Sequence, residues 1–347
     1  MMITMKFSVI IPFYFSQKHI SKCLDSLLAQ KVTGDFEILC CGDKVDDPTF
    51  AIIEEYAEKY PGKVQLLKQE GRGISGARNL GLLHSKGQYI MFVDADDTLE
   101  PDILALCEKA MVDTGADFAC VAFDRISPDG KRYSLEQSVP ELTITDVTPE
   151  IAAKLAFIPT APWGKLFRRE LLSGITFPEY PISCYEDCIF LLSIHPRVKR
   201  YVIVPKVLYH YLVHDEQSIQ TSSCSEKTQK FRNDMIDLRN KFIEENIPEP
   251  YLKMLDIAAL IHVGIADAHR AAEAPGISVR EFCAGAKIFL NENFPGWRKI
   301  KLRPYGVFTI RCKAVWILKN LYKINVAWIF ILCYNWFIKT LHIDVKW

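Results

Sequence analysis

The sequence predicts an α/β fold in which a mainly parallel sheet is flanked by helices and followed by a helical C-terminal extension. Three observations lead to this prediction. In residues 1–123, short apolar, β-prone runs alternate with segments of helical periodicity, and this alternation is typical of βαβ units. With 347 residues, 49% of them hydrophobic, the chain has room for two domains or for one domain with a large appendage. Residues 226–293 instead look mostly helical, with Ala-rich stretches.

Each expected element of the first half has a local signal. Residues 7–12 read as a buried strand, because the run is apolar and Pro12 marks its end. In residues 17–30 the apolar side chains recur at helical spacing on one face. Pro, Gly or polar loops delimit the elements that follow. These are strands at 36–41, 64–67 and 89–93, and helices at 49–60 and 73–85.

The order is less regular after residue 100. A helix is expected at 101–114, with Pro101 near its first turn, where a missing N–H is tolerated. Residues 117–123, 163–167 and 201–211 carry further strand signal, and 124–145 is a variable polar region. His210 lies in the last of these strands between two Tyr residues, so we expect it to pack in the core.

An acidic run follows the fourth strand, where Val93 is succeeded by Asp94, Ala95, Asp96 and Asp97. The carboxyl edge of an open α/β sheet is where ligands bind. Carboxylates spaced Asp-x-Asp can share one hard cation, and Mg²⁺ or Mn²⁺ at such a site also takes up phosphate oxygens of a substrate. The other interpretation, a solvated acidic turn before a helix, stays open at this point.

The charges are unevenly distributed, although the net charge is zero. Residues 297–347 hold ten Lys or Arg, one acid and five of the six Trp, which predicts a tail that meets an anionic surface. The longest uncharged stretch, 324–338, is shorter than the ~20 residues of a membrane span. We therefore expect a helix lying on the membrane. Packing on the α/β part of the chain or on a sister subunit is the alternative, and no nucleic-acid motif accompanies the charge.

The eleven cysteines show neither a C-x₂-C pattern nor a zinc spacing. A chain of this size needs no disulfides, so reduced thiols in a cytosolic setting are expected. The first strand begins at Phe7 without a preceding signal-peptide apolar region. These features predict a cytoplasmic protein, peripheral on the inner face of the cell membrane.

Four sequence blocks in residues 6–104 carry a resemblance to a known family. They are SVIIPFY at 8–14, CLDSLLAQ at 23–30, GISGARNLGL at 73–82 and FVDADD at 92–97. In this order they resemble the N-terminal half of family 2 glycosyltransferases, inverting enzymes with the GT-A fold that use nucleotide-diphosphate sugars. The similarity continues more weakly through WGKLF at 163–167, YEDCIF at 185–190 and LYHY at 208–211.

The resemblance implies a domain organisation. Residues 1–225 would be the GT-A catalytic domain, with a nucleotide-binding half at 1–123 and an acceptor half at 124–225. A helical region at 226–296 and the basic, aromatic, membrane-associating tail at 297–347 would follow.

The resemblance also implies roles for individual residues on the nucleotide side. Asp43 would accept a hydrogen bond from the base, and Pro12 and Tyr14 would line the same pocket. Arg78 would help to hold the nucleotide. The sequence departs from the family in the loop after the second strand, where GDKV at 42–45 replaces the usual Asp-Asp-Gly-Ser. It also has Phe15 in place of the Asn that usually follows Tyr14.

The remaining implied roles concern the metal and the chemistry. Asp94 would lie near the ribose and the metal, and Asp96 would be the direct ligand of Mn²⁺ or Mg²⁺. His214 would lie near the diphosphate or the metal. Asp187 would be the general base, with Glu186 as its neighbour; a charged helix start is the alternative interpretation of this pair.

The expected activity is transfer of a hexose or N-acetylhexosamine from a nucleotide-diphosphate sugar, UDP being favoured, to a hydroxyl group. The acceptor would be a lipid-linked or surface glycan. The expected partners are this donor, this acceptor, the membrane surface and a second copy of the chain in a homodimer, without nucleic acid. A nucleotidyltransferase is disfavoured, because no Gly-rich phosphate loop follows the first strand. The altered loop at 42–45 keeps one alternative open, a catalytically inactive glycosyltransferase-like partner subunit at the membrane.

Overall fold

The computed structural model describes part of the chain: residues 5–43, 46–69, 71, 73–127, 129–132, 143–179, 185–213, 225–274, 276–301 and 309–341. The chain divides into two compact units. The first comprises Met1–Val147 and Thr160–Ser218, and the second comprises Thr148–Pro159 and Ile219–Trp347.

The first unit is built on a nine-stranded sheet within the described residues. Its strands are β1 (Phe7–Phe13), β2 (Phe36–Gly42), β3 (Val64–Lys68), β4 (Tyr89–Phe92), β5 (Thr98–Leu99), β6 (Phe118–Ile126), β7 (Thr143–Asp146), β8 (Lys165–Arg168) and β9 (Arg200–Leu212). They lie in the order β3-β2-β1-β4-β8-β6-β9-β5, with β7 paired to β9. The longest pairings, β1 with β2 and β6 with β9, are parallel, while β8 runs antiparallel to β4 and β6. The predicted mainly parallel α/β sheet is confirmed.

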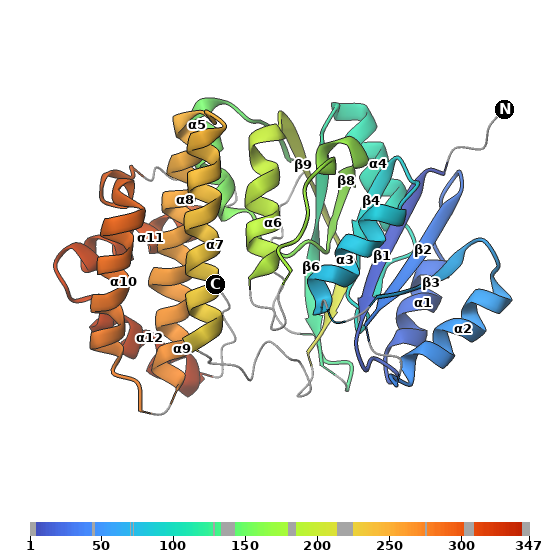
Figure 1. The fold of residues 1–347 in the computed structure, drawn as a ribbon, viewed down its shortest axis with the longest axis horizontal. Coiled ribbons are helices and arrows are strands. Elements are labelled where there is room, and N and C mark those ends of the chain that lie inside the picture. The colour runs from blue at the N-terminus through green and yellow to red at the C-terminus, as the bar shows by residue number, and fades with distance from the viewer. Residues whose placement is uncertain are drawn as a thin grey trace. The chain divides into compact units, whose positions relative to one another are not determined.

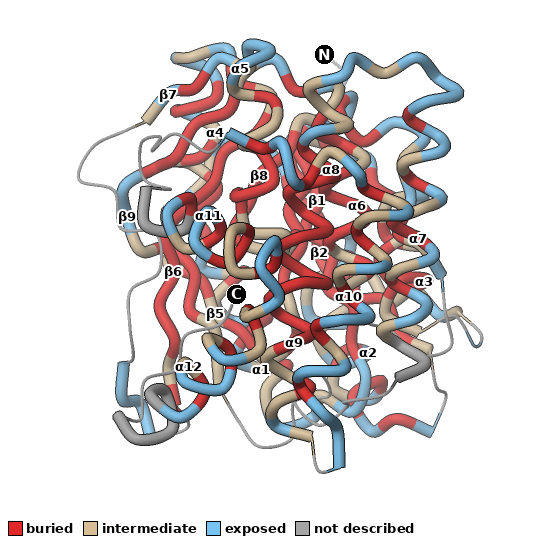
Figure 2. The backbone as a smooth tube through the Cα atoms, turned by 90° about the vertical axis from the view of Figure 1, so that its left-hand side faces the viewer, coloured by how far each residue is buried: buried red, intermediate tan, exposed pale blue. Residues whose placement is uncertain are grey.

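Helices cover both faces of this sheet. They are α1 (Ile20–Leu28), α2 (Thr49–Lys59), α3 (Gly73–His84), α4 (Ile103–Thr114) and α6 (Glu186–Ile194). Alternate side chains of β1 point to opposite faces: Val9 belongs to the core formed with α1 and α4, whereas Ile10 faces Gly81 of α3. Figure 1 shows α3 and α6 in front of the sheet. Figure 2 shows β1 and β2 buried along their length, as expected for strands covered on both sides.

A buried polar network fixes the start of β4 beside β1. Gly87 passes so close that a Cβ atom there would lie 2.4 Å from the backbone nitrogen of Ser8. The Ser8 hydroxyl accepts a hydrogen bond from the Gly87 N–H at 2.8 Å and donates one to Glu37 at 2.7 Å. Because β4 pairs with β1 in this register, the acidic residues that follow it emerge at the carboxyl edge of four parallel strands.

The second unit is helical, as predicted for the C-terminal extension. It contains α5 (Pro149–Ala152), the 3₁₀ turn η1 (Ala153–Phe157), α7 (Ser225–Glu244), α8 (Glu249–Ile261), α9 (Asp267–Glu273), α10 (Val279–Asn293), α11 (Thr309–Lys323) and α12 (Ala327–Leu341). A π-helical turn joins α8 to α9. The core includes the fully buried Trp297 and Tyr322, and the Tyr322 hydroxyl donates to the carbonyl of Gly264 in that turn at 2.5 Å. Among the described residues, no helix combines the length and hydropathy needed to cross a bilayer.

Candidate active site

The loop between β4 and β5 carries the acidic run. The side chain of Asp94 is 26% exposed, and Asp96 is also partly exposed, whereas Asp97 is buried. Burial raises the pKa of Asp94, the Arg78 guanidinium opposes this, and the nearby Asp96 carboxylate adds to it. The charges of Asp94 and Asp96, two residues apart on this loop, therefore interact.

Asp97 anchors the loop to β9. Its carboxylate accepts a hydrogen bond from the Tyr209 hydroxyl at 2.5 Å and another from the Leu212 N–H at 2.8 Å. The Tyr209 hydroxyl also accepts the Asp94 N–H at 3.3 Å. Burial raises the pKa of Asp97 well above its usual value, and the Tyr209 hydrogen bond counteracts this. Neither Asp97 nor Tyr209 was predicted to have a role in the site, although both lie in blocks that carry the family resemblance, 92–97 and 208–211.

Replacing Tyr209 with Phe is expected to lower the free energy of unfolding by about 1–3 kcal/mol, because it leaves a buried carboxylate without its hydroxyl donor. Urea unfolding measures this loss. Tyr211→Phe is the matched control, since both rings stack on Trp163 but that of Tyr211 is only half-buried. Equal losses in the two variants would mean that the Asp97 contact contributes little.

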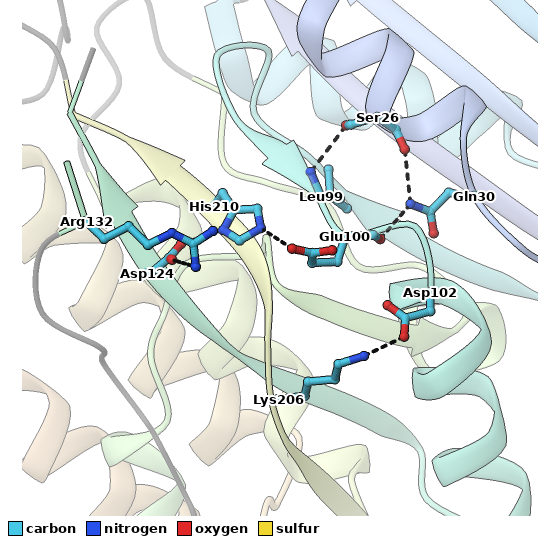
Figure 3. Close-up of polar contacts among 9 residues, drawn as sticks. All are labelled: Ser26, Gln30, Leu99, Glu100, Asp102, Asp124, Arg132, Lys206 and His210. Atoms are coloured by element: carbon cyan, nitrogen blue, oxygen red, sulfur yellow. Dashed lines mark hydrogen bonds and ion pairs between the residues drawn. The ribbon is translucent and has the colours of Figure 1, made fainter. Parts of the chain in front are cut away.

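A second polar network joins Glu100, the residue after β5, to β9 (Figure 3). The ring nitrogens of His210 lie 2.6 Å from Asp124 Oδ1 and 3.1 Å from Glu100 Oε1. Arg132 pairs with the other Asp124 oxygen at 3.1 Å. His210 is buried, as expected, but it is also hydrogen-bonded, because the pairing of β5 with β9 brings Glu100 next to it. Gln30, just beyond the end of α1, donates to the Glu100 carbonyl at 2.9 Å.

Arg78 connects the acidic loop to Glu186, which with Asp187 forms the acidic pair at the start of α6. Its guanidinium donates to Asp94 Oδ1 at 3.1 Å and to Glu186 Oε1 at 2.9 Å. The Arg78 side chain is 4% exposed and that of Glu186 is 9% exposed, so these contacts are shielded from water. Three predicted site residues, from α3, the loop after β4 and the start of α6, thus form one contact chain.

The residue after Arg78 fixes the segment that leads to α6. The Asn79 amide donates to the Phe177 carbonyl at 2.8 Å and accepts the Phe177 N–H at 2.8 Å. The Phe177 ring stacks on Phe190 of α6, with centroids 3.7 Å apart. The Arg78-Asn79 pair therefore holds both the start of α6 and the chain before it.

Asp187 lies in the first turn of α6, next to Glu186. It is half-buried, and Oδ1 of its carboxylate accepts the Cys188 N–H at 2.7 Å. The pKa of Asp187 is raised to about 7: burial has the largest effect, the charge of Glu186 adds to it, and Arg78 opposes it. A carboxyl group with a pKa near the working pH is well suited to act as a general base.

The residues predicted for the base pocket lie apart from this chain of contacts. Pro12 is buried in β1, and Tyr14 is 57% exposed just beyond it. The Asp43 carboxylate accepts N–H groups of Gly71 and Gly73 at 2.5 and 3.0 Å, at the start of α3. No contact between Asp43 and Arg78 is found in the described part of the chain. His214 and positions 44–45 lie outside the described residues, and the pocket roles of Pro12, Tyr14 and Asp43 stay predictions.

Phe15 adopts a backbone conformation that is energetically unfavourable for a phenylalanine. Its φ of 47° lies in the left-handed region, which costs a bulky residue about 1–2 kcal/mol and which Asn tolerates. Phe15→Asn is therefore expected to raise the free energy of unfolding by about 1 kcal/mol in urea unfolding. Tyr14→Asn, a neighbouring control outside this conformation, should give no such gain. A loss in Phe15→Asn would show that the edge contact between the Phe15 and Tyr14 rings, at 4.8 Å, matters more.

The acidic loop after β4 suits a divalent cation whose remaining coordination positions are filled by water and by the phosphates of a substrate. No group of three or more His, Cys, Asp or Glu side chains arranged for a metal occurs among the described residues. Asp94 and Asp96 nevertheless supply two carboxylates on one partly exposed loop. Mg²⁺ and Mn²⁺ commonly bind through one or two carboxylates, with waters and substrate phosphates filling the other positions.

Known proteins resemble the chain in sequence. Residues 8–176 match the family model described as Glycosyl transferase family 2. The poly(ribitol-phosphate) beta-glucosyltransferase of Bacillus spizizenii is 32% identical over 214 residues, which cover 60% of this chain and 32% of that protein. The poly(ribitol-phosphate) beta-N-acetylglucosaminyltransferase TarS of Staphylococcus aureus is 29% identical over 223 residues, 63% of this chain and 37% of TarS. The chain thus matches about a third of the length of these two curated relatives.

Solved structures agree with the fold. The crystal structure of S. aureus TarS 1–349 in complex with UDP-GlcNAc is similar with a TM-score of 0.69 and 20% identity, over 97% of this chain and 92% of that one. The mannosyltransferase PcManGT from Pyrobaculum calidifontis, in complex with GDP-Man and Mn²⁺, gives a TM-score of 0.52 and 17% identity, over 98% and 88% of the two chains. These similarities confirm the GT-A fold. The match over residues 8–176 shows that the chain carries a glycosyl transferase family 2 domain.

Proposed function

We propose that this chain is an inverting glycosyltransferase that moves a hexose or N-acetylhexosamine from a UDP-sugar to a hydroxyl group of a glycan acceptor. One observation carries the proposal: the buried Arg78 bonds both to Asp94 of the acidic loop and to Glu186, the neighbour of Asp187. The groups needed for departure of the diphosphate and for activation of the acceptor therefore belong to one rigid arrangement. The relative crystallised with UDP-GlcNAc supports UDP as the nucleotide.

On the donor side, Asp94 and Asp96 would hold the divalent cation, and Asp43, Pro12 and Tyr14 the base. A cation bound there supplies positive charge that stabilises the departing diphosphate. The chain's own part is to hold the loop that carries both carboxylates, through the bonds of Asp97 to Tyr209 and of Arg78 to Asp94. Such preorganised charge is more effective than charge that must rearrange during the reaction.

On the acceptor side, Asp187 would take the proton from the attacking hydroxyl. The new bond forms between that oxygen and the anomeric carbon while the bond to the diphosphate breaks, in one displacement. A single base on the face opposite the leaving group inverts the configuration. Glu186 and Arg78 are positioning residues in this scheme, because their buried ion pair fixes the start of α6.

The acceptor we propose is a glycan or polyol-phosphate polymer, since two relatives act on poly(ribitol-phosphate). A lipid-linked form of such a polymer would place the enzyme on the inner face of the cell membrane, where nucleotide sugars are available.

The proposal is tested by release of UDP from UDP-glucose and UDP-N-acetylglucosamine, with Mn²⁺ and with poly(ribitol-phosphate) as the acceptor. Acceptor-dependent release that is lost in Asp187→Asn supports it. A folded wild type that binds UDP but releases none, with either sugar and several polymer acceptors, would instead favour the inactive partner subunit, for which the altered loop at 42–45 is the motivation.

A further inference from the structure

The last two helices of the second unit expose an unusual amount of apolar surface. The described residues include fourteen exposed large hydrophobic side chains, and six of them lie between 316 and 336. They are Trp316 and Ile317 on α11, Ile324 in the turn, and Ile329, Leu332 and Trp336 on α12. In Figure 2, pale blue stretches mark both helices. The concentration in one hairpin sets this surface apart from scattered exposed residues.

Helix α12 is apolar on opposite faces. Ala327, Ile331 and Asn335 are buried and recur every four residues. Ile329, Leu332 and Trp336 are exposed and recur at spacings of three and four, so at ~100° per residue they lie on the side opposite the buried face. A helix on a water-exposed surface normally carries polar residues there. The exposed face of α12 therefore suits an apolar environment.

The hairpin that presents this face is held firmly. Lys319 donates from its buried side chain to the Ile300 carbonyl at 2.6 Å. Lys287 of α10 donates to the Lys323 carbonyl at 3.0 Å and to the Asn325 side chain at 2.5 Å. Asn325 adopts the left-handed conformation, with φ of 62°, that reverses the chain between α11 and α12. Ile324 and Lys323 thus lie at the tip of a fixed hairpin.

The charges within the stretch that forms the hairpin have a single sign. Residues 297–343 contain no Asp or Glu. Among the residues of this stretch whose burial is described, five Lys or Arg side chains are exposed: Arg298, Lys299, Lys301, Lys313 and Lys323. Exposed cations next to Trp and aliphatic side chains are typical of segments that lie on an anionic lipid surface.

We propose that the α11–α12 hairpin is a membrane-docking surface that lies flat on bilayers containing anionic phospholipid. The exposed side chains of α12 enter the boundary between headgroups and acyl chains, and the cations contact lipid phosphates. With fifteen residues, α12 is ~22 Å long and cannot span the ~30 Å hydrocarbon core, so it lies in the interface. Binding in this way does not require the transferase activity.

Co-sedimentation of the full chain with vesicles tests the proposal. The vesicles are pure phosphatidylcholine or an equimolar mixture with phosphatidylglycerol. We expect affinity for the mixed vesicles at least about tenfold above that for the neutral ones, falling as salt is raised. Leu332→Glu should weaken vesicle binding about tenfold or more, because it places a charge where the wild type inserts an apolar side chain into the lipid. Leu83→Glu is the matched control, since Leu83 is a 79% exposed residue of α3 in the other unit, and should bind like wild type.

Several outcomes would overturn the proposal. One is equal binding to neutral and anionic vesicles, and another is binding that Leu332→Glu leaves intact. A third is that the wild type fails to bind vesicles but is a dimer in sedimentation equilibrium, and that Leu332→Glu dissociates this dimer. That result would assign the exposed face to contact with a second copy of the chain. If Leu332→Glu does not fold, the double variant Lys313→Glu/Lys323→Glu changes only exposed side chains and should abolish the preference for anionic lipid.

Discussion

Replacing Asp187 with Asn is expected to lower kcat by roughly 10²–10⁴-fold, because the amide cannot accept the proton of the attacking hydroxyl. Affinity for UDP and Mn²⁺ should stay close to that of the wild type, since Asp187 serves the acceptor. Steady-state rates of UDP release and calorimetric titration with UDP separate the two effects. Asp113→Asn, which removes an exposed carboxylate paired to Lys109, should leave both unchanged. A kcat within threefold of wild type in Asp187→Asn would place the base elsewhere.

The pH dependence of the wild type provides a second check on the same residue. The pKa of Asp187 is raised to about 7, chiefly by burial. Below that pH the carboxyl group is protonated in the folded enzyme and cannot act as a base. We therefore expect kcat/KM to fall about tenfold for each pH unit below 7 and to level off above it. A profile that is flat from pH 5 to 8 would contradict the assignment.

Replacing Arg78 with Met is expected to lower the free energy of unfolding by about 3–5 kcal/mol, because it leaves buried carboxylates without their counter-ion. Glu186 is affected most, since its side chain is 9% exposed and bonds to Arg78 at 2.9 Å. Asp94 loses its partner as well. Urea unfolding measures the loss, and UDP release should fall with it, because the metal loop and the start of α6 would no longer be held together.

A second substitution distinguishes this mechanism from a simple loss of packing. In Arg78→Met/Glu186→Gln the carboxylate that was left unpaired is neutral, so part of the lost stability should return. A double variant that is no more stable than Arg78→Met would mean that the guanidinium acts mainly by packing on Phe177, whose ring centroid lies 5.3 Å away.

Local patterns were sufficient to predict most of the first unit. The strand prediction at 36–41 corresponds to β2 at Phe36–Gly42, and the helix prediction at 73–85 to α3 at Gly73–His84. These elements have the periodicities that arise when a strand is covered on both faces or a helix on one. The short strands β5 and β7 were not predicted, because two or four residues are too few to show a period and exist only through their pairing with β9.

The site was predictable residue by residue but not as an arrangement. The family resemblance pointed to Arg78, Asp94 and Glu186 separately. Their common contact joins positions 108 residues apart, which no local pattern can reveal. The same holds for the bond between Tyr209 and Asp97, across 112 residues. The polar partners of His210 were not predicted for a related reason, since they come from other segments of the chain.

The central claim is that Asp94 and Asp96 bind a UDP-sugar through a divalent cation. Calorimetric titration of the full chain with UDP, GDP and dTDP, each with and without Mn²⁺, tests it most directly, with Asp96→Asn as the variant. We expect that UDP binds most tightly, that its affinity depends on Mn²⁺, and that Asp96→Asn abolishes this dependence while the fold persists. Binding of UDP that is indifferent both to Mn²⁺ and to Asp96→Asn, or tighter binding of GDP or dTDP, would contradict it.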